Sequence, residues 1–456
     1  MEVDKNLFLY DLAVVAIMKN EGPYVKEWLD YHLLAGVDHF FIYNNGSPDN
    51  QSEVIKPYVD AGLVTYIDYP GKARQYEAYN AAVTEYRYFC RYMAFIDGDE
   101  FILPKSRPTI TAVVDEILAG KPDAAALVAN WRIYGSNYHD TADYTKSVQE
   151  RFTRCEKVIN HHVKTIADPR KIVFIWNPHF AMYFKDYFAV NENGATVLQL
   201  FNEELTADKI VINHYYTKSR EEFANKLQRG IADTQHNQYE FSNFSHDNKS
   251  NEVFNDEILK YRDARKNLLV PAGGDIVETF TDINFPNCER LLRAVSSNLL
   301  PGFTSDDAQE FFNNPQNRYE YFEMLVKFFS VAPQDFFDGR TETFLTCFAV
   351  SSFLKDNFVD EELGSLLEEF SLNGLCKSLA AGVNSYEVNI FLRELPKILA
   401  LPYPAVNELR SAGIKLIPQL TSTYRTYNPT DWIEFIYMNY ILNMLKVFDN
   451  YHRNQT

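Results

Sequence analysis

Four short apolar runs alternate with three amphipathic stretches in the first hundred residues, and this order restricts the chain to few folds. The apolar runs lie at 12–18, 39–43, 63–69 and 92–96. Runs of this length and composition predict strands that are buried on both faces. The intervening stretches, at about 22–36, 51–61 and 72–90, have the apolar spacing of helices. Strands and helices that alternate through short connections predict an α/β fold with a parallel sheet covered by helices on both faces.

Polar clusters follow three of the four predicted strands. They read "KNE" at 19–21, "NNGSPD" at 44–49 and "DGDEF" at 97–101. In an open α/β sheet, ligands bind beyond the carboxyl ends of the strands. The sequence therefore predicts a binding site at the edge of the sheet where these clusters lie.

The third cluster has the pattern of a metal site. Asp97 and Asp99 face the same side of an extended stretch because side chains alternate along it, and Gly98 lets a ligand approach the backbone. Two carboxylates suit Mg²⁺ or Mn²⁺, which usually keep coordination places for phosphate oxygens. We expect Glu100 to cap or orient the turn and Phe101 to lie in the core. The alternative is a solvated acidic turn, because Asp-x-Asp also occurs by chance.

Other phosphate chemistries fit less well. An aspartyl phosphatase also ends a strand with Asp-x-Asp, but it needs a Thr or Val soon after the second Asp, where this chain has Phe101. Neither GxxxxGK[ST] nor GxGxxG occurs, which weakens the kinase and dinucleotide-binding interpretations.

Charge and cysteine content exclude further classes. The formal net charge of the 456 residues is −18, which argues against nucleic-acid binding, since that relies on cations that neutralise phosphates. The five cysteines are scattered without a Cys-x-x-Cys pair, which argues against structural zinc or a disulfide framework and favours a reducing compartment. No segment reaches the roughly 18 consecutive apolar residues of a membrane span. We therefore predict a cytoplasmic protein without a transmembrane segment.

A composition change near "VPAGGD", at 270–275, predicts two domains. We expect an α/β domain over 1–270 and an all-α domain over 271–456, where aromatic and apolar residues recur at helical spacing. The second region carries no catalytic motif, and dimerisation, acceptor binding and membrane-surface docking stay open as its roles. Within the first region, Ser219 and Glu222 form a capping-box pattern at the start of a predicted helix over 219–231.

Several motifs in one order resemble a known family. They are "AIMKNEGPYVKEWLDYHLLAGVDHFFIYNNGSPDN" from residue 16, "RQYEAYN" from 74, "FIDGDEF" from 95, "NWRIYGSN" from 130, "VKTI" from 163 and "INHYYTKSREEFANKLQRG" from 212. Together they resemble the start of a GT-A glycosyltransferase, and more narrowly glycosyltransferase family 92 with its bacterial relatives. The resemblance covers about residues 10–235 and leaves the region after 270 uncovered.

The resemblance implies a metal-dependent, inverting transfer of a hexose, with galactose as the expected sugar. The donor would be a UDP-sugar held with Mn²⁺ or Mg²⁺, and the acceptor a hydroxyl group of a glycan. Without the membrane anchor of eukaryotic members, the chain looks like a cytoplasmic, bacterial form that contributes to a surface polysaccharide or lipopolysaccharide. A homo-oligomer through the helical domain is also expected.

The resemblance implies a nucleotide pocket built from residues after the first two strands and at the start of the third helix. These residues are Asn20, Glu21, Asn44, Ser47, Asp49, Arg74 and Gln75. Local structure offers an alternative for most of them, because Asn, Ser and Asp are common in turns and helix caps. A cation at a helix start is unfavourable beside the helix dipole, which favours a ligand role for Arg74.

Three later residues are implied around the diphosphate. His214, at the end of the run from 209, would complete the metal site with Asp97 and Asp99, although a buried core histidine fits the same pattern. Lys218 and Arg229 would neutralise the leaving diphosphate. A solvated helix face is the alternative for both of these cations.

The general base is the least determined residue. Transfer requires a group that deprotonates the acceptor hydroxyl, and the loop after "NWRIYGSN" offers His139, Asp140 and Asp143, of which we choose Asp140. Trp131 and Tyr134 would stack on sugars or lie in the core. The sequence leaves the roles of three further histidines, His161, His162 and His179, undetermined.

Two rival functions remain. A nucleotidyltransferase that makes nucleotide sugars would use similar metal chemistry, but usually has a glycine-rich basic loop near its N-terminus, which is absent here. A protein that binds nucleotide sugars or carbohydrates on an inactive transferase fold is the alternative from a different class. The intact Asp-x-Asp argues against it.

Overall fold

The structure is a computed structural model that describes residues 8–229, 247–281, 337, 339–356, 361–381, 385–426, 428 and 432–454. The chain separates into two compact units. One spans Tyr10–Ile283, and the other comprises Met1–Leu9 together with Asn284–Thr456. The predicted site lies in the unit Tyr10–Ile283.

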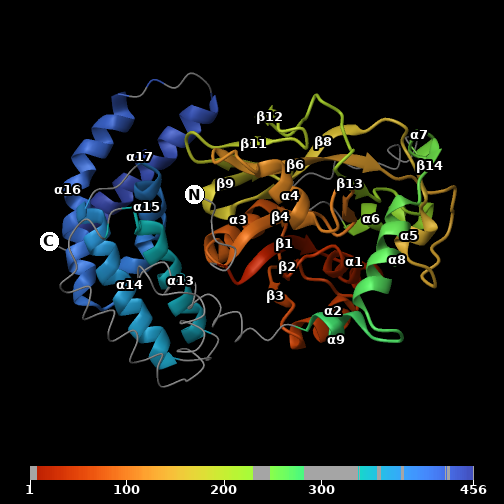
Figure 1. Cartoon of the computed structure of the whole chain (residues 1–456), viewed down its shortest axis with the longest axis horizontal. Coiled ribbons are helices and arrows are strands. Elements are labelled where there is room, and N and C mark those ends of the chain that lie inside the picture. The colour runs from red at the N-terminus through yellow and green to blue at the C-terminus, as the bar shows by residue number, and fades with distance from the viewer. Residues whose placement is uncertain are drawn as a thin grey trace. The chain divides into compact units, whose positions relative to one another are not determined.

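The start of this unit has the predicted alternation of strands and helices (Figure 1). The elements are β1 (Tyr10–Met18), α1 (Gly22–Leu34), β2 (His39–Asn44), α2 (Gln51–Asp60), β3 (Val64–Asp68), α3 (Gln75–Tyr86) and β4 (Cys90–Phe95). β1 pairs in parallel with both β2 and β4, and β2 pairs in parallel with β3. The predicted parallel α/β sheet is therefore confirmed for this half, in the order β3-β2-β1-β4.

The second half of the sheet mixes directions. Its main strands are β5 (Glu100–Pro104), β6 (Ala124–Ile133), β8 (Asn160–Ala167), β11 (Phe188–Val190), β12 (Thr196–Val197) and β13 (Ile210–His214). β8 lies antiparallel between β4 and β6, and β6 pairs in parallel with β11 and then with β13. β5 pairs antiparallel with β13. This order brings the carboxyl ends of β4 and β13 to one region of the sheet, beside the middle of the antiparallel β8.

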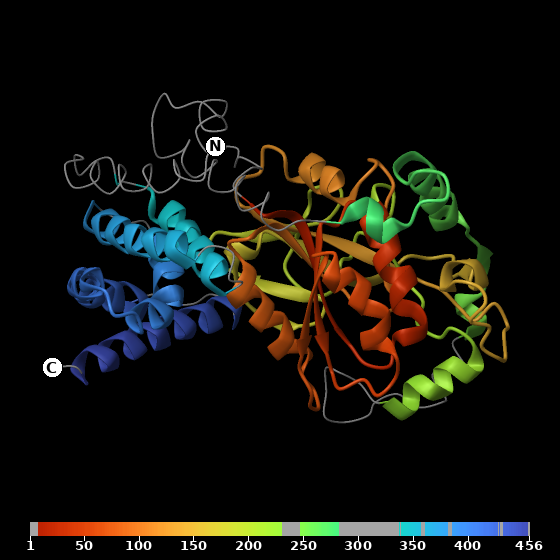
Figure 2. The same ribbon diagram turned by 90° about the horizontal axis from the view of Figure 1, so that it is seen from below.

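Smaller elements surround the sheet. They are α4 (Ile110–Leu118), α5 (Val148–Arg151), β7 (Arg154–Cys155), a 3-10 turn (Pro169–Lys171), the hairpin β9 (Ile172–Asn177) and β10 (Phe180–Tyr183), α6 (Arg220–Arg229), α7 (Asp247–Ser250), β14 (Val253–Phe254), α8 (Glu257–Leu269) and α9 (Ile276–Phe280). Figure 2 shows helices on both sides of the strands. The unit ends beyond the predicted boundary at 270, because α8 and α9 both pack against α1.

The alternation of side chains along β1 builds the core. Its even-numbered side chains share one cluster with the buried face of α1, namely Leu12, Val14, Ala16, Met18, Val25, Trp28 and Leu29. α3 packs against β1 as well. The indole N–H of Trp28 donates to the carbonyl of Glu100 at 2.8 Å, and the hydroxyl of Tyr31 donates to the carbonyl of Ile102 at 3.0 Å. α1 therefore holds β5 directly after the acidic turn, and Phe101 is buried as predicted.

A buried ion pair fixes α6 beside α1 and α5. The predicted capping box is present, since Glu222 N–H donates to Ser219 Oγ and Ser219 N–H donates to the Glu222 carboxylate. Arg151 contacts both carboxylate oxygens of Glu222 at 2.8 and 2.9 Å, and their side chains are 4% and 2% exposed. Burial alone would raise the pKa of Glu222, but Arg151 and Ser219 outweigh it and lower the pKa to about 2.

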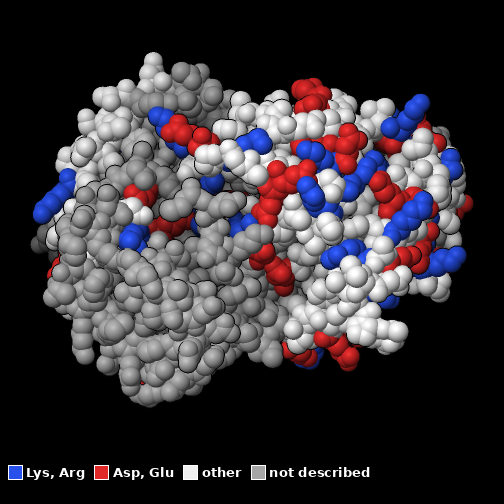
Figure 3. Space-filling view, in the orientation of Figure 1, with Lys and Arg blue, Asp and Glu red and all other residues white. Residues whose placement is uncertain are grey.

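In the second unit, the described residues form the helices α13 (Thr341–Asp356), α14 (Glu361–Ala381), α15 (Ser385–Leu399), α16 (Pro404–Thr426) and α17 (Trp432–Arg453). α14 packs against α13 and α16, and α17 packs against α15 and α16. No helix in the described ranges is long and apolar enough to cross a bilayer. On the face of the first unit in Figure 3, lysine and arginine side chains are interspersed with aspartate and glutamate.

We predict that Glu222→Gln lowers the free energy of unfolding by about 3 kcal/mol, because Arg151 then stays buried without a carboxylate. The folded pKa of Glu222 lies below its ordinary value of 4.5. The stabilisation is therefore complete above about pH 4.5 and is lost as the pH falls toward 2. Urea denaturation at pH 7 and pH 3 measures both effects.

The control is Asp60→Asn, which removes an exposed ion pair with Lys56 and costs about 0.5 kcal/mol or less. The interpretation is wrong if Glu222→Gln costs no more than this control. It is also wrong if the cost is the same at both pH values.

Candidate functional site at the carboxyl ends of the strands

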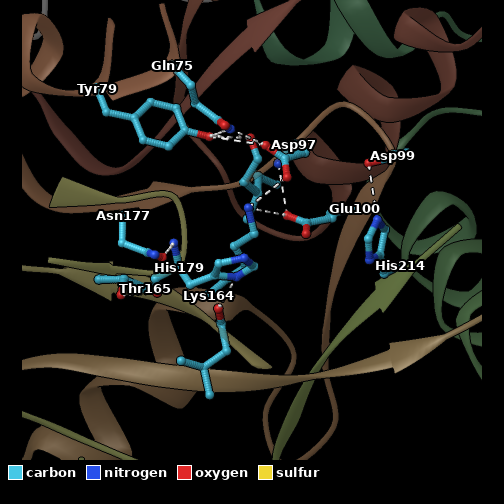
Figure 4. Close-up of polar contacts among 12 residues, drawn as sticks. Gln75, Tyr79, Asp97, Asp99, Glu100, Lys164, Thr165, Asn177, His179 and His214 are labelled. Carbon is cyan, nitrogen blue, oxygen red and sulfur yellow. Dashed lines mark hydrogen bonds and ion pairs between the residues drawn. The ribbon is translucent and has the colours of Figure 1, made fainter. Parts of the chain in front are cut away.

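The acidic turn joins β4 to β5 and contacts side chains from α3, β8, β13 and α6, and Figure 4 shows those from the first three. β8 pairs with β4 so that Ala94 is opposite Ile166, which brings Lys164 beside the end of β4. β13 pairs with β5 so that His214 is opposite Glu100. Sheet register therefore brings Lys164 to Asp97 across 67 positions of the sequence, and His214 to Glu100 across 114.

Asp97 is held by three donors. Gln75 Nε2 donates to Oδ1 at 2.6 Å, Tyr79 OH donates to the same oxygen at 3.3 Å, and Lys164 Nζ donates to Oδ2 at 2.8 Å. Figure 4 shows Gln75 and Tyr79 pointing to Asp97 together, with Lys164 approaching from below. Burial alone would raise the pKa of Asp97, but the charge of Lys164 and its hydrogen bond lower it. Asp97 is therefore an oriented, ionised carboxylate.

Lys164 also contacts Glu100, and both side chains are completely buried. The distance from Lys164 Nζ to Glu100 Oε2 is 3.2 Å. Burial opposes the charge on Lys164, yet Asp97 and Glu100 together raise its pKa. Burial, helped by Asp97 and Asp99, raises the pKa of Glu100 to about 8 although Lys164 opposes this. Glu100 Oε2 also accepts the N–H of Asp97 at 2.9 Å, so it orients the turn as predicted.

Asp99 faces a different set of partners. Lys226 Nζ, from α6, lies 2.7 Å from its Oδ2, and His214 Nε2 lies 3.6 Å from its Oδ1. Burial would raise the pKa of Asp99, but Lys226 and His214 hold it well below its usual range. Burial lowers the pKa of His214 despite Asp99. A neutral histidine and an ionised aspartate are the protonation states in which both side chains bind a metal ion.

This donor set suits a divalent cation whose coordination is completed by a ligand. No group of three or more His, Cys, Asp or Glu side chains that could hold a metal ion occurs among the described residues. Asp99 Oδ1 and His214 Nε2 lie close enough to share one ion, and His214 Nδ1 is buried without a hydrogen-bond partner in that part of the chain. Mg²⁺ sites commonly have one or two carboxylates plus phosphates and water. Asp97 is held by its three other donors.

The residues after β1 and β2 form one network. The N–H of Asn20 donates to Ser47 Oγ at 2.9 Å, and the N–H of Gly22 donates to Asp49 Oδ2 at 2.8 Å. Asn44 Oδ1 accepts the N–H of Ser47 at 3.0 Å. Turn structure therefore accounts for the side chains of Ser47 and Asp49. Asn20 has a φ of 57°, and its Oδ1 is buried without a hydrogen-bond partner among the described residues.

Glu21 and Lys218 lie together beside this network. Glu21 occupies the N-cap position of α1 without a side-chain capping bond. Its Oε2 is 3.9 Å from Lys218 Nζ, which lies 4.0 Å from the centre of the Tyr24 ring. Lys218 is among the cations that lower the pKa of Asp99, so it links the acidic turn to α1.

Arg74 and Asp140 have contacts other than the acidic turn. Arg74 is half exposed and pairs with Glu77. The side chain of Arg229, the last residue of α6, lies outside the described part of the chain. Asp140 is exposed, and its carbonyl accepts the N–H of Glu221 at 3.0 Å. The structure therefore brings Gln75, Asp97, Asp99 and His214 together, and it shows Arg74 and Asp140 with other partners.

The aromatic and histidine candidates pack around the site. Tyr134 is buried with its hydroxyl on Asn255, so it belongs to the core. The ring of Trp131 lies 4.4 to 5.0 Å from the rings of His162, His179 and His214. Burial lowers the pKa of His179 to about 3. His162 and His179 therefore pack against the ring of Trp131.

Sequence reasoning missed Lys164, Lys226 and Tyr79 as site residues. Lys164 had a visible signal, because a lysine inside the apolar "VKTI" strand needs a buried partner. Lys226 and Tyr79 lie on helices at positions that resemble any solvated or core residue, so only the fold identifies them.

A cavity of about 430 Å³ runs beside α1. One face of α1, the segment 144–151 and α8 line it, and Tyr24 and Tyr144 contribute aromatic rings whose centres are 6.0 Å apart. Tyr24 also contacts Lys218 and Glu222. The cavity therefore begins next to the Glu21–Lys218 pair.

The chain is similar in sequence to proteins of one family. The model described as Glycosyltransferase family 92 matches residues 16–257. A family 92 protein from Ricinus communis is 26% identical over 234 residues, 49% of this chain and 38% of that protein. One from Oryza sativa subsp. japonica is 30% identical over 224 residues, 49% of this chain and 36% of that protein.

Shorter and weaker similarities were also found. Galactan beta-1,4-galactosyltransferase GALS3 from Arabidopsis thaliana is 29% identical over 103 residues, 20% of each chain. The chain thus matches less than two fifths of the length of these three relatives. The crystal structure of S. aureus TarS covers 79% of this chain and 55% of its own at 10% identity, with a TM-score of 0.26, which supports no argument.

We predict that Lys164→Met lowers the free energy of unfolding by about 3–5 kcal/mol, because Glu100 is completely buried and Asp97 is two-thirds buried, and both lose their cation. The double variant with Glu100→Gln recovers part of the loss, since Gln is neutral at every pH and the buried Glu100 no longer has to be held in its neutral form beside Asp97 and Asp99. Urea denaturation of the two single variants and the double variant measures this coupling. Strictly additive losses would contradict a shared ion-pair cluster.

Proposed function

The chain belongs to glycosyltransferase family 92, and we propose that it moves a hexose from a UDP-sugar to a glycan hydroxyl with inversion at the anomeric carbon. Galactose is the proposed sugar, since two Arabidopsis relatives are named galactan beta-1,4-galactosyltransferases. The observation that carries the proposal is the Asp99–His214 pair at the end of neighbouring strands. Residues 10–235 would have the GT-A fold.

Asp99 and His214 would hold Mn²⁺ or Mg²⁺, which supplies positive charge to the diphosphate of the donor. Asp97, fixed by Gln75, Tyr79 and Lys164, would orient the donor through its ionised carboxylate. Its hydrogen bonds are in place before the donor arrives. The site is therefore preorganised, and little reorganisation is needed at the reaction step.

The loop between β1 and α1 and the loop between β2 and α2 would together hold the nucleoside. Asn20 has a buried amide oxygen without a partner among the described residues. Ser47 connects Asn20 to Asn44, because its hydroxyl accepts the N–H of Asn20 and its own N–H donates to Asn44 Oδ1. Ser47 and Asp49 would shape the loop after β2, and Gln75 would orient Asp97. Arg74 would lie at the entrance to the nucleotide pocket. Lys218 and Arg229 would face the leaving diphosphate.

The reaction would be one in-line displacement. The acceptor oxygen forms a bond to the anomeric carbon as the bond from that carbon to the diphosphate oxygen breaks, and UDP leaves with the electron pair. The acceptor proton passes to a general base, for which we propose Asp140. The loop of Asp140 continues into the segment 144–151 that lines the cavity beside α1, so an acceptor in that cavity would lie near this loop.

The biological setting stays a proposal. A role in bacterial surface polysaccharide or lipopolysaccharide synthesis, a cytoplasmic location and a homo-oligomer through the helical unit are proposed from the sequence alone. The second candidate function is a sugar- or nucleotide-sugar-binding protein on an inactive fold. Lys164 pairs with Asp97, and Lys226 pairs with Asp99. These ion pairs favour the inactive binding protein only if they prevent metal binding.

We predict that UDP-galactose with Mn²⁺ raises the melting temperature of the wild type. At a ligand concentration of about 100 times the dissociation constant, the stabilisation is about 2.7 kcal/mol. Asp99→Asn and His214→Ala lose the shift because the ion is no longer held, whereas the surface control Asp60→Asn keeps it. A thermal-shift screen of nucleotide sugars with and without metal measures this.

Two outcomes of that screen would contradict the proposal. One is a shift that is the same with and without metal in all variants. The other is a metal-dependent shift without transfer to any glycan acceptor in a mass-spectrometric assay, which would favour the inactive binding protein.

For the general base, we predict that Asp140→Asn lowers kcat by about 10²–10⁴-fold. The dissociation constant of the donor stays unchanged, because Asp140 would contact only the acceptor hydroxyl. Steady-state kinetics at saturating donor measures kcat. Full activity of Asp140→Asn would assign the base to another residue and leave the donor site unaffected.

A further inference from the structure

Lys226 forms an ion pair with Asp99, the carboxylate that a metal ion at this site would need. Its Nζ lies 2.7 Å from Asp99 Oδ2 and donates to the carbonyl of Tyr216 at 3.1 Å, and it lies 4.5 Å from the centre of the Tyr216 ring. Asp99 Oδ1 faces His214. A divalent cation between Asp99 and His214 would therefore lie next to an ammonium group, and the two like charges repel.

The two lysines of the site differ in their freedom to move. Lys164 is completely buried between Asp97 and Glu100, so its ammonium group cannot leave these two partners for solvent or for a ligand. Lys226 has a 16% exposed side chain and only one carboxylate partner among the described residues. A lysine has a flexible four-carbon stem and a compact charge that pairs readily with phosphate. Lys226 is therefore the cation that can exchange partners.

We propose that Lys226 is the counter-ion that makes metal binding depend on the nucleotide. Without nucleotide, Lys226 pairs with Asp99 and weakens binding of the divalent cation. When a nucleoside diphosphate binds, Lys226 transfers from Asp99 to the diphosphate oxygens, and Asp99 becomes available to the metal. This inference rests on the proposed function, because it assumes that a nucleoside diphosphate binds at the strand ends.

Removing Lys226 is expected to change the affinities for the metal and for the nucleotide in opposite directions. Removing Lys226 frees Asp99 for the metal, so the affinity for the metal alone rises. The same change removes a cation from the diphosphate, so the affinity for the nucleotide alone falls. A lysine that only supports the local structure would change both affinities in the same direction, or neither.

The test uses Mn²⁺ alone and UDP alone as probes of the whole chain. Free Mn²⁺ is followed by electron paramagnetic resonance during titration of protein, and UDP binding is measured by calorimetry in EDTA. In the wild type, UDP is expected to tighten Mn²⁺ binding about 5–150-fold. In Lys226→Met, we expect Mn²⁺ alone to bind at least about fivefold more tightly and UDP alone to bind more weakly.

Two controls separate charge from structure. Lys226→Arg keeps the positive charge, so its Mn²⁺ and UDP affinities are expected to stay near those of the wild type. Lys105→Met removes a lysine that pairs with Glu257 and contacts the carbonyl of Ala207, and is expected to change neither affinity. Near-UV circular dichroism confirms that each variant is folded.

The inference is overturned if folded Lys226→Met binds Mn²⁺ as weakly as the wild type or more weakly. It is also overturned if Lys226→Arg behaves like Lys226→Met, because the effect would then be steric. If Lys226→Met fails to fold, Lys226→Gln replaces it, with the same expected signs. Failure of the proposed function gives a different result, in which wild-type protein binds UDP neither with nor without Mn²⁺.

Discussion

The buried ammonium of Lys164 is the interaction on which the rest of the site depends. Three carboxylates gather within four residues of the turn after β4, and burial alone would favour their neutral forms. Lys164 contacts two of them, Asp97 and Glu100, from the neighbouring strand. Asp97 consequently stays ionised and oriented, while Glu100 accepts the N–H of Asp97 and shapes the turn. β8 thus carries the positive charge that compensates the partly buried acidic turn.

The two lysines of the site have separate consequences. Lys164 compensates charge permanently because it is enclosed, whereas Lys226 compensates Asp99 from a partly exposed position on α6. α6 is itself held through the buried Arg151–Glu222 pair. The position of Lys226 relative to Asp99 therefore depends on an ion pair one turn earlier on the same face of this helix.

The sequence predicted the first half of the sheet closely, because buried parallel strands and amphipathic helices have strong local signatures. It also predicted that Asp97, Asp99 and His214 share one edge. The mixed half of the sheet has no such signature, since its pairings join β6 to strands from distant segments. Lys226 was missed because it lies on a helix at a position that resembles a solvated residue. Ser47 and Asp49, predicted as ligand residues, have hydrogen bonds that turn structure already explains. Local patterns identify elements and their ends, but partners of a buried charge follow from register.

The central claim is that Asp99 and His214 hold a divalent cation against a nucleoside diphosphate. The most direct measurement is an anomalous difference map, at the manganese absorption edge, from crystals grown with Mn²⁺ and UDP. The account predicts one strong peak within bonding distance of Asp99 Oδ1, His214 Nε2 and the diphosphate oxygens, with Lys226 turned away from Asp99. A map with ordered UDP but no peak at these atoms, and with Lys226 still paired to Asp99, would contradict it.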